Sequence, residues 1–421
     1  MPGHKGIGEI EKYDLTEIRG ADSLYEANGI IKESEENASR LFGCYTLYST
    51  EGSSLAIRAM LHLALLMRSD DKNPLILAGR NAHKVFISAA ALCNFDIEWL
   101  CGKETSYISC KIDAKSVADK LDSMERPPVA VYLTSPDYLG NTVDIKAISD
   151  VCHSRGVLLL VDNAHGAYLA FTEPSLHPIA LGADMCADSA HKTLPCLTGA
   201  AYLHLSDTVP DSIKSRAKSA LELFGSTSPS YLILSSLDRV NAYLADGYKE
   251  KLAEFTEKLN QLKSNLVLVG YELLGDEPMK LTVSAKSYGY TGHELADILI
   301  KNNIVPEFYD EDYLVLMPTP EITEINLAKL EVVLISLRKK ERIQIAPPAM
   351  HLPVRRLSPR EAIFADSETV SIDDALGRVL ANITVGCPPA VPIVVSGEKI
   401  DENAIQAFKY YGIGNCSVIK E

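Results

Sequence analysis

The chain has 421 residues, 47% of them hydrophobic and 23% charged, with a formal net charge of −15 at pH 7. This length exceeds one ordinary compact core and predicts two or three domains. The acidic balance argues against nucleic acid or an anionic membrane as the main partner. The sequence shows no apolar stretch of membrane-spanning length and no charged leader before an apolar run, so we expect a cytoplasmic protein.

The nine cysteines are scattered along the chain and form no C-x-x-C pair. Their odd number and mostly apolar surroundings are typical of buried, reduced thiols and disfavour disulfides or a zinc site. We therefore expect no metal site.

After an N-terminal segment at 1–50, the stretch 51–263 alternates short apolar strands with amphipathic helices. Helices are expected at 53–68, 82–93, 114–124 and 144–154. Strands are expected at 74–79, 96–100, 128–136 and 157–163. Strands this continuously apolar suit a parallel sheet that helices cover on both faces. The alternation predicts a large, doubly wound α/β domain.

The pattern changes toward the C-terminus. A long helical region at about 229–263 closes the large domain and could act as a connector, and 264–340 predicts a smaller α+β domain. In that domain we expect strands around 266–274, 279–285 and 313–320, and helices at 292–302 and 323–339. The last part, 341–421, is richer in proline and forms a predicted C-terminal domain.

The strongest chemical signal is VLLLVDNAHGAYL at 157–169, followed by ADSAHKTL at 187–194. A strand that ends in Asp162 places a carboxylate at the carboxyl edge of a parallel sheet, where open α/β folds bind ligands. Lys192 lies between apolar segments, where a solvated surface lysine is not expected. An amine that forms a Schiff base and a carboxylate that keeps a pyridine nitrogen protonated are what pyridoxal 5′-phosphate (PLP) requires. The pair predicts a PLP enzyme.

Residues next to this pair complete the predicted cofactor site. Alternation along the strand places the small Ala164 on the same side as Asp162, which leaves room for the ring face. His165 follows Ala164, and Ser189 and His191 precede Lys192. We expect these side chains to order the cofactor and to lower the pKa of the lysine amine.

Two further motifs have both a functional and a structural interpretation. Gly52, Ser53 and Ser54 open a helix, so free N–H groups and hydroxyls there would bind a phosphate; the alternative is an ordinary serine N-cap. His83 follows a strand and suits stacking on the PLP ring; the alternative is a histidine that caps the next helix. The loop TSPDYLG at 134–140 contributes Ser135 and Asp137 as pocket candidates.

Four further histidines lie in predicted helices or strands, and the sequence indicates no functional partner for any of them. We interpret them as structural or surface residues: His62, His153, His204 and His293.

At this point the sequence resembles the ornithine/lysine/arginine decarboxylases of the aspartate-aminotransferase fold. The resemblance spans nearly the whole chain and rests on these motifs: PGHKG at 2–6, DLTEIRGADSL at 14–24, RNAHKVF at 80–86, VDNAHGAY at 161–168, SAHKTLPCLTGAAYLH at 189–204 and CPPAVPIVVSGE at 387–398. It implies fold type I of the PLP-dependent enzymes, in a short form without the N-terminal wing domain of the longest members.

By the same resemblance, Lys192 carries the cofactor, His83 stacks on its ring and Asp162 pairs with its nitrogen. Ser53, Ser54, Ser189 and His191 would surround the phosphate and the imine. The family builds its sites at a subunit interface, which implies a homodimer or a larger even assembly.

The predicted reaction is loss of the α-carboxylate from a basic amino acid, with arginine first, lysine second and ornithine third. Lys192 or His191 would reprotonate Cα. Glu398 and Asp137 are candidates for binding the far end of the substrate.

Two alternatives remain open at this point. An aminotransferase would clamp the substrate carboxylate with an arginine of the later domains, for which Arg355, Arg356 and Arg378 are candidates. A relative that binds PLP without catalysis, or merely keeps the fold, would serve as an interaction or regulatory subunit.

Overall fold

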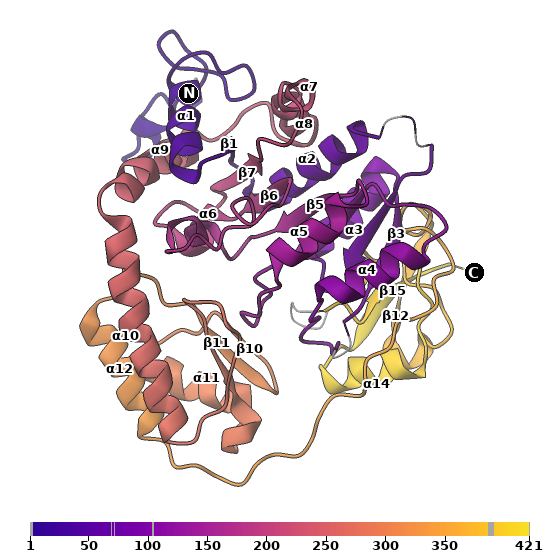
Figure 1. Cartoon of the computed structure of the whole chain (residues 1–421). Helices are drawn as coiled ribbons and strands as arrows, with labels where there is room; N and C mark the ends of the chain where they lie inside the picture. The colour runs from indigo at the N-terminus through magenta and orange to yellow at the C-terminus, as the bar shows by residue number, and fades with distance from the viewer. Residues whose placement is uncertain (1–2, 69, 71, 103–104, 386–390, 421) are drawn as a thin grey trace.

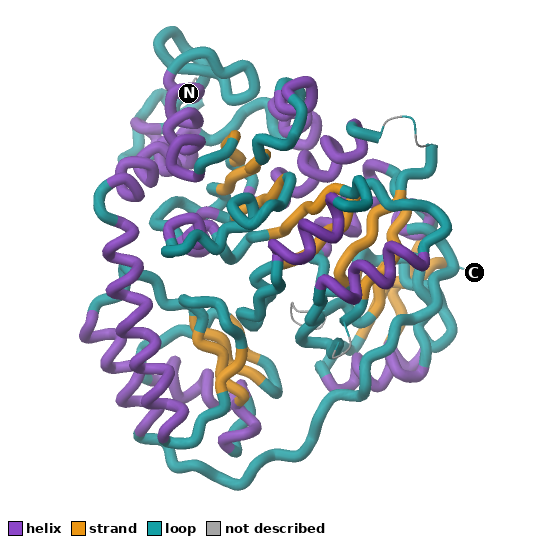
Figure 2. The backbone as a smooth tube through the Cα atoms, viewed as in Figure 1, coloured by secondary structure: helices purple, strands orange, loops and turns teal. Residues whose placement is uncertain are grey.

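The computed structural model describes residues 3–68, 70, 72–102, 105–385 and 391–420. A large α/β unit, a smaller α+β unit below it in this view and a C-terminal unit to one side make up the chain (Figure 1). Helices and longer strands alternate through the large unit, and two of its helices precede the sheet of the smaller unit (Figure 2). Among the described helices, none combines the length and the apolar character needed to span a membrane.

The large unit is built on a seven-stranded sheet in the order β1-β7-β6-β5-β4-β2-β3. Its strands are β1 (Tyr45–Ser49), β2 (Leu75–Gly79), β3 (Asp96–Leu100), β4 (Ala130–Thr134), β5 (Leu158–Asp162), β6 (Met185–Asp188) and β7 (Ala201–Leu205). Strands β2 to β6 pair in parallel, whereas β7 runs antiparallel to β6 and β1. The parallel core confirms the predicted doubly wound fold and gathers the carboxyl ends of β2, β4, β5 and β6 at one edge.

Both faces of the sheet are buried because successive side chains of a strand point to opposite faces. In β4, Tyr132 packs in one core with residues of α2 and α3, whereas Val131 and Leu133 pack in another with residues of α4 and α5. The expected helices are confirmed to within two residues at each end: α2 (Gly52–Leu66), α3 (Lys84–Cys93), α4 (Ala114–Ser123) and α5 (Ile145–His153). Further helices of this unit are α1 (Ile30–Phe42), η2 (Ala167–Phe171), α6 (Ala190–Thr193), α7 (Asp211–Lys214) and α8 (Ala217–Phe224).

Two helices form the long helical region expected over 229–263. They are α9 (Tyr231–Ala245) and α10 (Tyr248–Leu268), and they meet at Gly247. Gly247 has a φ of +69°, a left-handed conformation that ends helical hydrogen bonding and that glycine adopts without a Cβ clash.

The strand expected at 266–274 is wrong in its first half, because α10 continues to Leu268. Leu259, Leu262 and Leu266 are buried along one stripe of the helix, at spacings of three and four residues. Only β8 (Leu273–Leu274) is extended in this stretch. The apolar run therefore follows helical periodicity rather than strand alternation.

The smaller unit contains a four-stranded antiparallel sheet in the order β10-β11-β9-β8. Its remaining elements are β9 (Leu281–Ser284), η3 (Ala285–Tyr288), α11 (Gly292–Lys301), β10 (Phe308–Tyr309), β11 (Tyr313–Leu316) and α12 (Glu324–Ile335). The other strands and both helices expected for this region are confirmed, with α12 ending earlier than 339. Its core is continuous with apolar residues of α9, α10 and the large unit.

A linker over 338–354 without helix or strand leads to the C-terminal unit and crosses the lower edge of Figure 1. The unit consists of α13 (Pro359–Ile363), β12 (Ser367–Ser371), η4 (Ile372–Asp374), β13 (Thr384–Val385), β14 (Val394–Val395), α14 (Glu402–Tyr410) and β15 (Asn415–Ile419). Its α13 packs against α3 of the large unit. Residues 387–390 of the proline-rich motif, and Pro2 of the first motif, lie outside the described residues.

Candidate active site

A cavity of about 420 Å³ lies where β2, β4, β5 and β6 end, a volume typical of small-molecule sites. Most residues predicted for the site lie in its wall: Gly52, Ser53, Ser54, His83, Asp137, Asp162, Ala164, His165, Ser189, His191 and Lys192. The fold thus brings together residues from five separate stretches of sequence. Two predicted residues, Ser135 and Glu398, are not part of this wall.

Lys192 lies on the short helix α6, directly after β6, and its side chain is half-buried. Its Nζ is 3.0 Å from Nε2 of His165. Burial lowers the pKa of the Lys192 amine, although Asp162 and Glu307 oppose that shift. Burial also lowers the pKa of His165, and the nearby cation of Lys280 adds to the effect. A neutral imidazole therefore faces an amine that gives up its proton more readily than a surface lysine does.

Asp162 is the last residue of β5 and is only 2% exposed. The hydroxyl of Tyr132 donates to its Oδ2 at 3.2 Å, and the backbone N–H of Ala164 donates to its Oδ1 at 3.2 Å. Burial raises the pKa of Asp162, while His83 and Lys192 oppose the rise. A carboxylate in this position is stabilised by a cation in the cavity, which is what a protonated pyridine nitrogen provides.

The start of α2 has features expected of an anion site. The N-cap of this 15-residue helix is Glu51, whose side chain makes no capping bond, so neither Ser53 nor Ser54 is the N-cap. The hydroxyl of Ser189 donates to Oγ of Ser53 at 2.8 Å, which joins the lysine segment to the helix start. First-turn N–H groups have no partner within the helix and favour a negative group.

His83 caps a helix and also lies in the cavity wall. It is the N-cap of α3, where its Nδ1 accepts the N–H of Val85 at 3.3 Å, and its side chain lines the cavity. Desolvation lowers the pKa of His83, while the carboxylate of Asp162 opposes the shift. The cap fixes the ring at the cavity edge.

The loop after β4 is held by its own hydrogen bonds. Ser135 is buried, and its hydroxyl accepts the N–H of Val143 at 3.3 Å. Asp137 lies in the cavity wall, but its carboxylate accepts the N–H groups of Leu139 and Asn141 at 3.0 and 2.8 Å. These bonds shape the loop and leave Asp137 little capacity for a ligand.

Glu398 is bound within the chain, away from the cavity wall. Its two carboxylate oxygens accept from Arg80 at 2.6 and 2.8 Å, and both side chains are almost fully buried. Oε2 also accepts the N–H of Val395 at 2.8 Å. Arg80 follows β2 directly, so the pair joins the C-terminal unit to the edge of the sheet that carries the cavity.

Replacing Glu398 by glutamine is expected to destabilise the protein by about 3–5 kcal/mol, because Arg80 would keep a buried charge without its partner. Urea unfolding followed by circular dichroism measures the effect. The matched control is Asp150→Asn, which breaks the solvent-exposed Lys146–Asp150 pair and should change stability far less. Equal losses in the two variants would contradict a structural role for the buried pair.

Tyr138, Lys280 and Glu307 are among the residues near the cavity that were not anticipated. Tyr138 lies in the wall, with its ring 5.2 Å from that of His165, and its hydroxyl donates to Glu307 at 3.3 Å. Lys280 is buried and donates to the carbonyl of Asp137 at 2.7 Å. Burial lowers the pKa of Lys280 to about 8. Tyr138 lies within the TSPDYLG motif, whereas Lys280 and Glu307 come from the smaller unit and carry no local signal.

The fold is shared with solved enzymes. The lysine decarboxylase A from Pseudomonas aeruginosa superimposes with a TM-score of 0.81 at 18% identity, over 100% of this chain and 78% of that chain. The Francisella novicida lysine decarboxylase superimposes with a TM-score of 0.79 at 18% identity, over 98% of this chain and 75% of that chain. The fold class is therefore fold type I of the PLP-dependent enzymes.

Sequence comparison gives the family. Residues 7–274 match the Orn/Lys/Arg decarboxylase major domain, and residues 347–414 match the Orn/Lys/Arg decarboxylase C-terminal domain. Two arginine decarboxylases are 31% identical: that of Halalkalibacterium halodurans over 96% of this chain and 88% of its own, and that of Bacillus subtilis over 98% and 90%. The chain belongs to the Orn/Lys/Arg decarboxylase family and is a decarboxylase. This membership implies PLP as the cofactor.

Proposed function

We propose that the chain decarboxylates a basic amino acid with PLP bound to Lys192, with arginine the first candidate substrate, lysine the second and ornithine the third. The observation that carries the proposal is the shared cavity of Lys192 and Asp162. An imine-forming amine and a nitrogen-facing carboxylate in one cavity are the two requirements of PLP chemistry. The ranking of substrates rests on the 31% identical relatives, both named as arginine decarboxylases.

The residues present fit the cofactor. The buried carboxylate of Asp162 needs a cation, which the protonated ring nitrogen would supply. The phosphate would bind at Gly52, Ser53, Ser54 and Ser189, where the helix start is left without a side-chain cap. When bound, PLP supplies an electron sink for the electron pair of the broken Cα–carboxylate bond.

The chain's own residues would position the cofactor, transfer protons and bind the substrate. Ala164 and His83 would confine the ring, because both lie in the cavity wall. Nε2 of His165 would accept a proton from Nζ of Lys192, with which it is in hydrogen-bond contact. Lys192 or His191 would return a proton to Cα. The Tyr138–Glu307 pair at the cavity edge would present a negative charge to the cationic end of the substrate.

The candidate arginines for an aminotransferase do not reach the cavity. Arg355 donates to the carbonyl of Ile97, Arg378 pairs with Glu368, and Arg356 is exposed. No described arginine lies in the cavity wall, which supports decarboxylation over transamination.

The working form is proposed to be a homodimer or a larger even assembly. The support is the N-terminal segment, where Ile7, Ile10 and Tyr13 are 86%, 66% and 65% exposed. Large apolar side chains gathered at one end of a chain suit a subunit contact. Light scattering on the PLP-loaded protein would give the mass, and a monomer would contradict this part of the proposal.

The test is to incubate the purified, PLP-loaded protein with arginine, lysine and ornithine in turn, and to measure CO₂ and the amine product. Release of CO₂ and agmatine in equal amounts would establish arginine as a substrate. A keto acid with pyridoxamine phosphate would instead establish an aminotransferase. Protein that stays colourless with PLP and releases no CO₂ would establish a non-catalytic relative.

Ser189→Ala is expected to weaken PLP binding by about tenfold, because a hydrogen bond from a hydroxyl to a charged phosphate stabilises by roughly 1.5–3 kcal/mol. Equilibrium dialysis of the cofactor-free protein against PLP measures the dissociation constant. Ser154→Ala, which removes an exposed hydroxyl bonded to Val151, is the control and should not change it. Unchanged binding in Ser189→Ala would place the phosphate elsewhere.

A further inference from the structure

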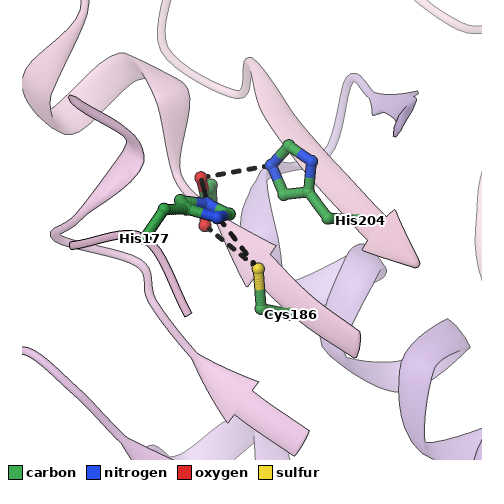
Figure 3. A group of neighbouring side chains, drawn as sticks. His177, Cys186 and His204 are labelled. Carbon is green, nitrogen blue, oxygen red and sulfur yellow. Dashed lines mark hydrogen bonds and ion pairs between the residues drawn. The ribbon is translucent and has the colours of Figure 1, made fainter. Parts of the chain in front are cut away.

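A second group of reactive side chains lies buried behind β6. His177, Cys186, Asp188 and His204, here called the buried quartet, are each no more than 1% exposed. His177 comes from the segment after η2, Cys186 and Asp188 from β6, and His204 from β7 (Figure 3). None of the four lines the cavity of Lys192.

The donor atoms of the quartet converge on one point. Nε2 of His177 and Nε2 of His204 lie 3.0 and 3.2 Å from Oδ2 of Asp188. Sγ of Cys186 is 3.8 Å from Nε2 of His177 and 3.8 Å from Oδ1 of Asp188 (Figure 3). One donor atom from each residue lies within 4.8 Å of every other.

These separations suit a small tetrahedral cation. Zinc bonds of about 2.0–2.3 Å place N and O ligands roughly 3.3 Å apart, and N and S ligands roughly 3.6 Å apart. The observed 3.0, 3.2 and 3.8 Å depart from these values by a few tenths of an ångström. Small rotations of the side chains would therefore be enough to admit the ion.

The neighbours of the quartet orient its ligands. The hydroxyl of Thr46 lies 3.3 Å from the carbonyl oxygen of Cys44 and, when it donates there, accepts from Nδ1 of His204, which is 2.9 Å away. That bond places the hydrogen of a neutral His204 on Nδ1 and leaves Nε2 free to bind a metal. Asn163 donates to Oδ1 of Asp188 at 2.7 Å and fixes the carboxylate.

We propose that the buried quartet binds one divalent transition-metal ion, of which zinc is the best match. A thiolate, a carboxylate and two neutral imidazoles carry two negative charges, so the complex with a divalent cation is neutral. Neutrality matters because an uncompensated charge in a buried position is costly. The thiol proton of Cys186, and any extra proton held by the imidazoles, pass to solvent when the ion binds.

The spacing of the four residues explains why the sequence predicts no such site. Positions 177, 186, 188 and 204 match no short metal-binding motif, and His204 alone suggests only a structural role. The ion would join β6, β7 and the segment of His177, and its nearest ligand, Asp188, lies four positions before Lys192 in the chain. We assign it a structural role, as a clamp on the strand that precedes Ser189 and Lys192.

The first experiment measures zinc in the full-length protein purified from zinc-supplemented cells, by mass spectrometry of the metal. About one zinc ion per chain is expected, and Cys186→Ser should lower the bound zinc by at least about tenfold at the same free zinc concentration. Cys152→Ser is the matched control, since Cys152 is a buried thiol outside the quartet. Zinc content that is equal in the two variants would overturn the proposal.

The second experiment identifies the ligand directly. Protein loaded with Co²⁺ should show a thiolate-to-metal absorption band, present in Cys152→Ser and absent in Cys186→Ser. A folded wild-type protein that binds neither Zn²⁺ nor Co²⁺ at micromolar concentration would show a hydrogen-bonded network of Asp188 with two histidines and would refute the metal site. Neither measurement depends on PLP or on decarboxylase activity.

Discussion

CO₂ release from the preferred amino acid is expected to fall by roughly 10³-fold or more in Lys192→Ala. The amine has two proposed roles, covalent attachment of the cofactor and return of a proton to Cα, and alanine performs neither. Its side chain is half-buried, and its Nζ lies 3.0 Å from Nε2 of His165 in the cavity that Asp162 also lines. No other described lysine lies in the cavity wall. Labelled CO₂ from carboxyl-labelled substrate provides the measurement.

Two controls separate lost chemistry from lost structure in this variant. Lys146→Ala removes an exposed lysine on α5 and should keep full activity. Thermal unfolding of Lys192→Ala should stay close to that of the cofactor-free wild type, because a half-buried lysine contributes little to packing. Borohydride treatment should attach PLP to the wild type and not to Lys192→Ala. Activity within tenfold of the wild type would refute the assigned role.

Asp162→Asn is expected to reduce kcat by about 10²–10³-fold, a loss typical of removing one preorganised electrostatic group. Asparagine has nearly the same shape and can still accept from Tyr132 or Ala164. It lacks the negative charge that holds a proton on the pyridine nitrogen, so the ring would withdraw electrons less strongly. Steady-state CO₂ release gives kcat, and covalent attachment of PLP should survive.

The matched control for this prediction is Asp122→Asn, which changes an exposed carboxylate paired with Arg155. Its kcat should equal that of the wild type. If Asp162→Asn kept its kcat but lost PLP, the carboxylate would serve cofactor affinity alone. If it kept both, the electronic role assigned to Asp162 would be wrong.

Local sequence predicted strands β2 to β5 of the sheet and helices α2 to α5, but it did not predict strands β1, β6 and β7. The run LLLVD of β5 is apolar at every position but the last, since both faces of the strand are covered, and its final residue is the polar Asp162. The same logic located His83 after β2, whereas Lys192 was predicted from the motif around it and not from β6, which the sequence analysis did not anticipate. Residues at the carboxyl ends of parallel strands lie at the same edge of the sheet, regardless of the loop conformations. These candidates therefore line one cavity.

Contacts between the units could not be predicted from local sequence, because they join residues that are far apart in the chain. Glu398 has the residue type expected for binding a cationic substrate, but Arg80, 318 positions away, occupies both of its oxygens. Nothing near Lys280 in the sequence indicates that the smaller unit buries it beside Asp137. The apolar run at 266–274 is compatible with strand or helix, and only the buried stripe of α10 decides between them.

The linker at 338–354 and the Arg80–Glu398 ion pair together predict the outcome of limited proteolysis. Most of the linker is exposed and without regular structure, so a protease would cut there first. The two fragments would still share the buried ion pair, and Arg360 would still bond the carbonyl of Ala91 at 2.7 Å. A nicked chain should therefore co-elute as one particle under native conditions and separate only in denaturant.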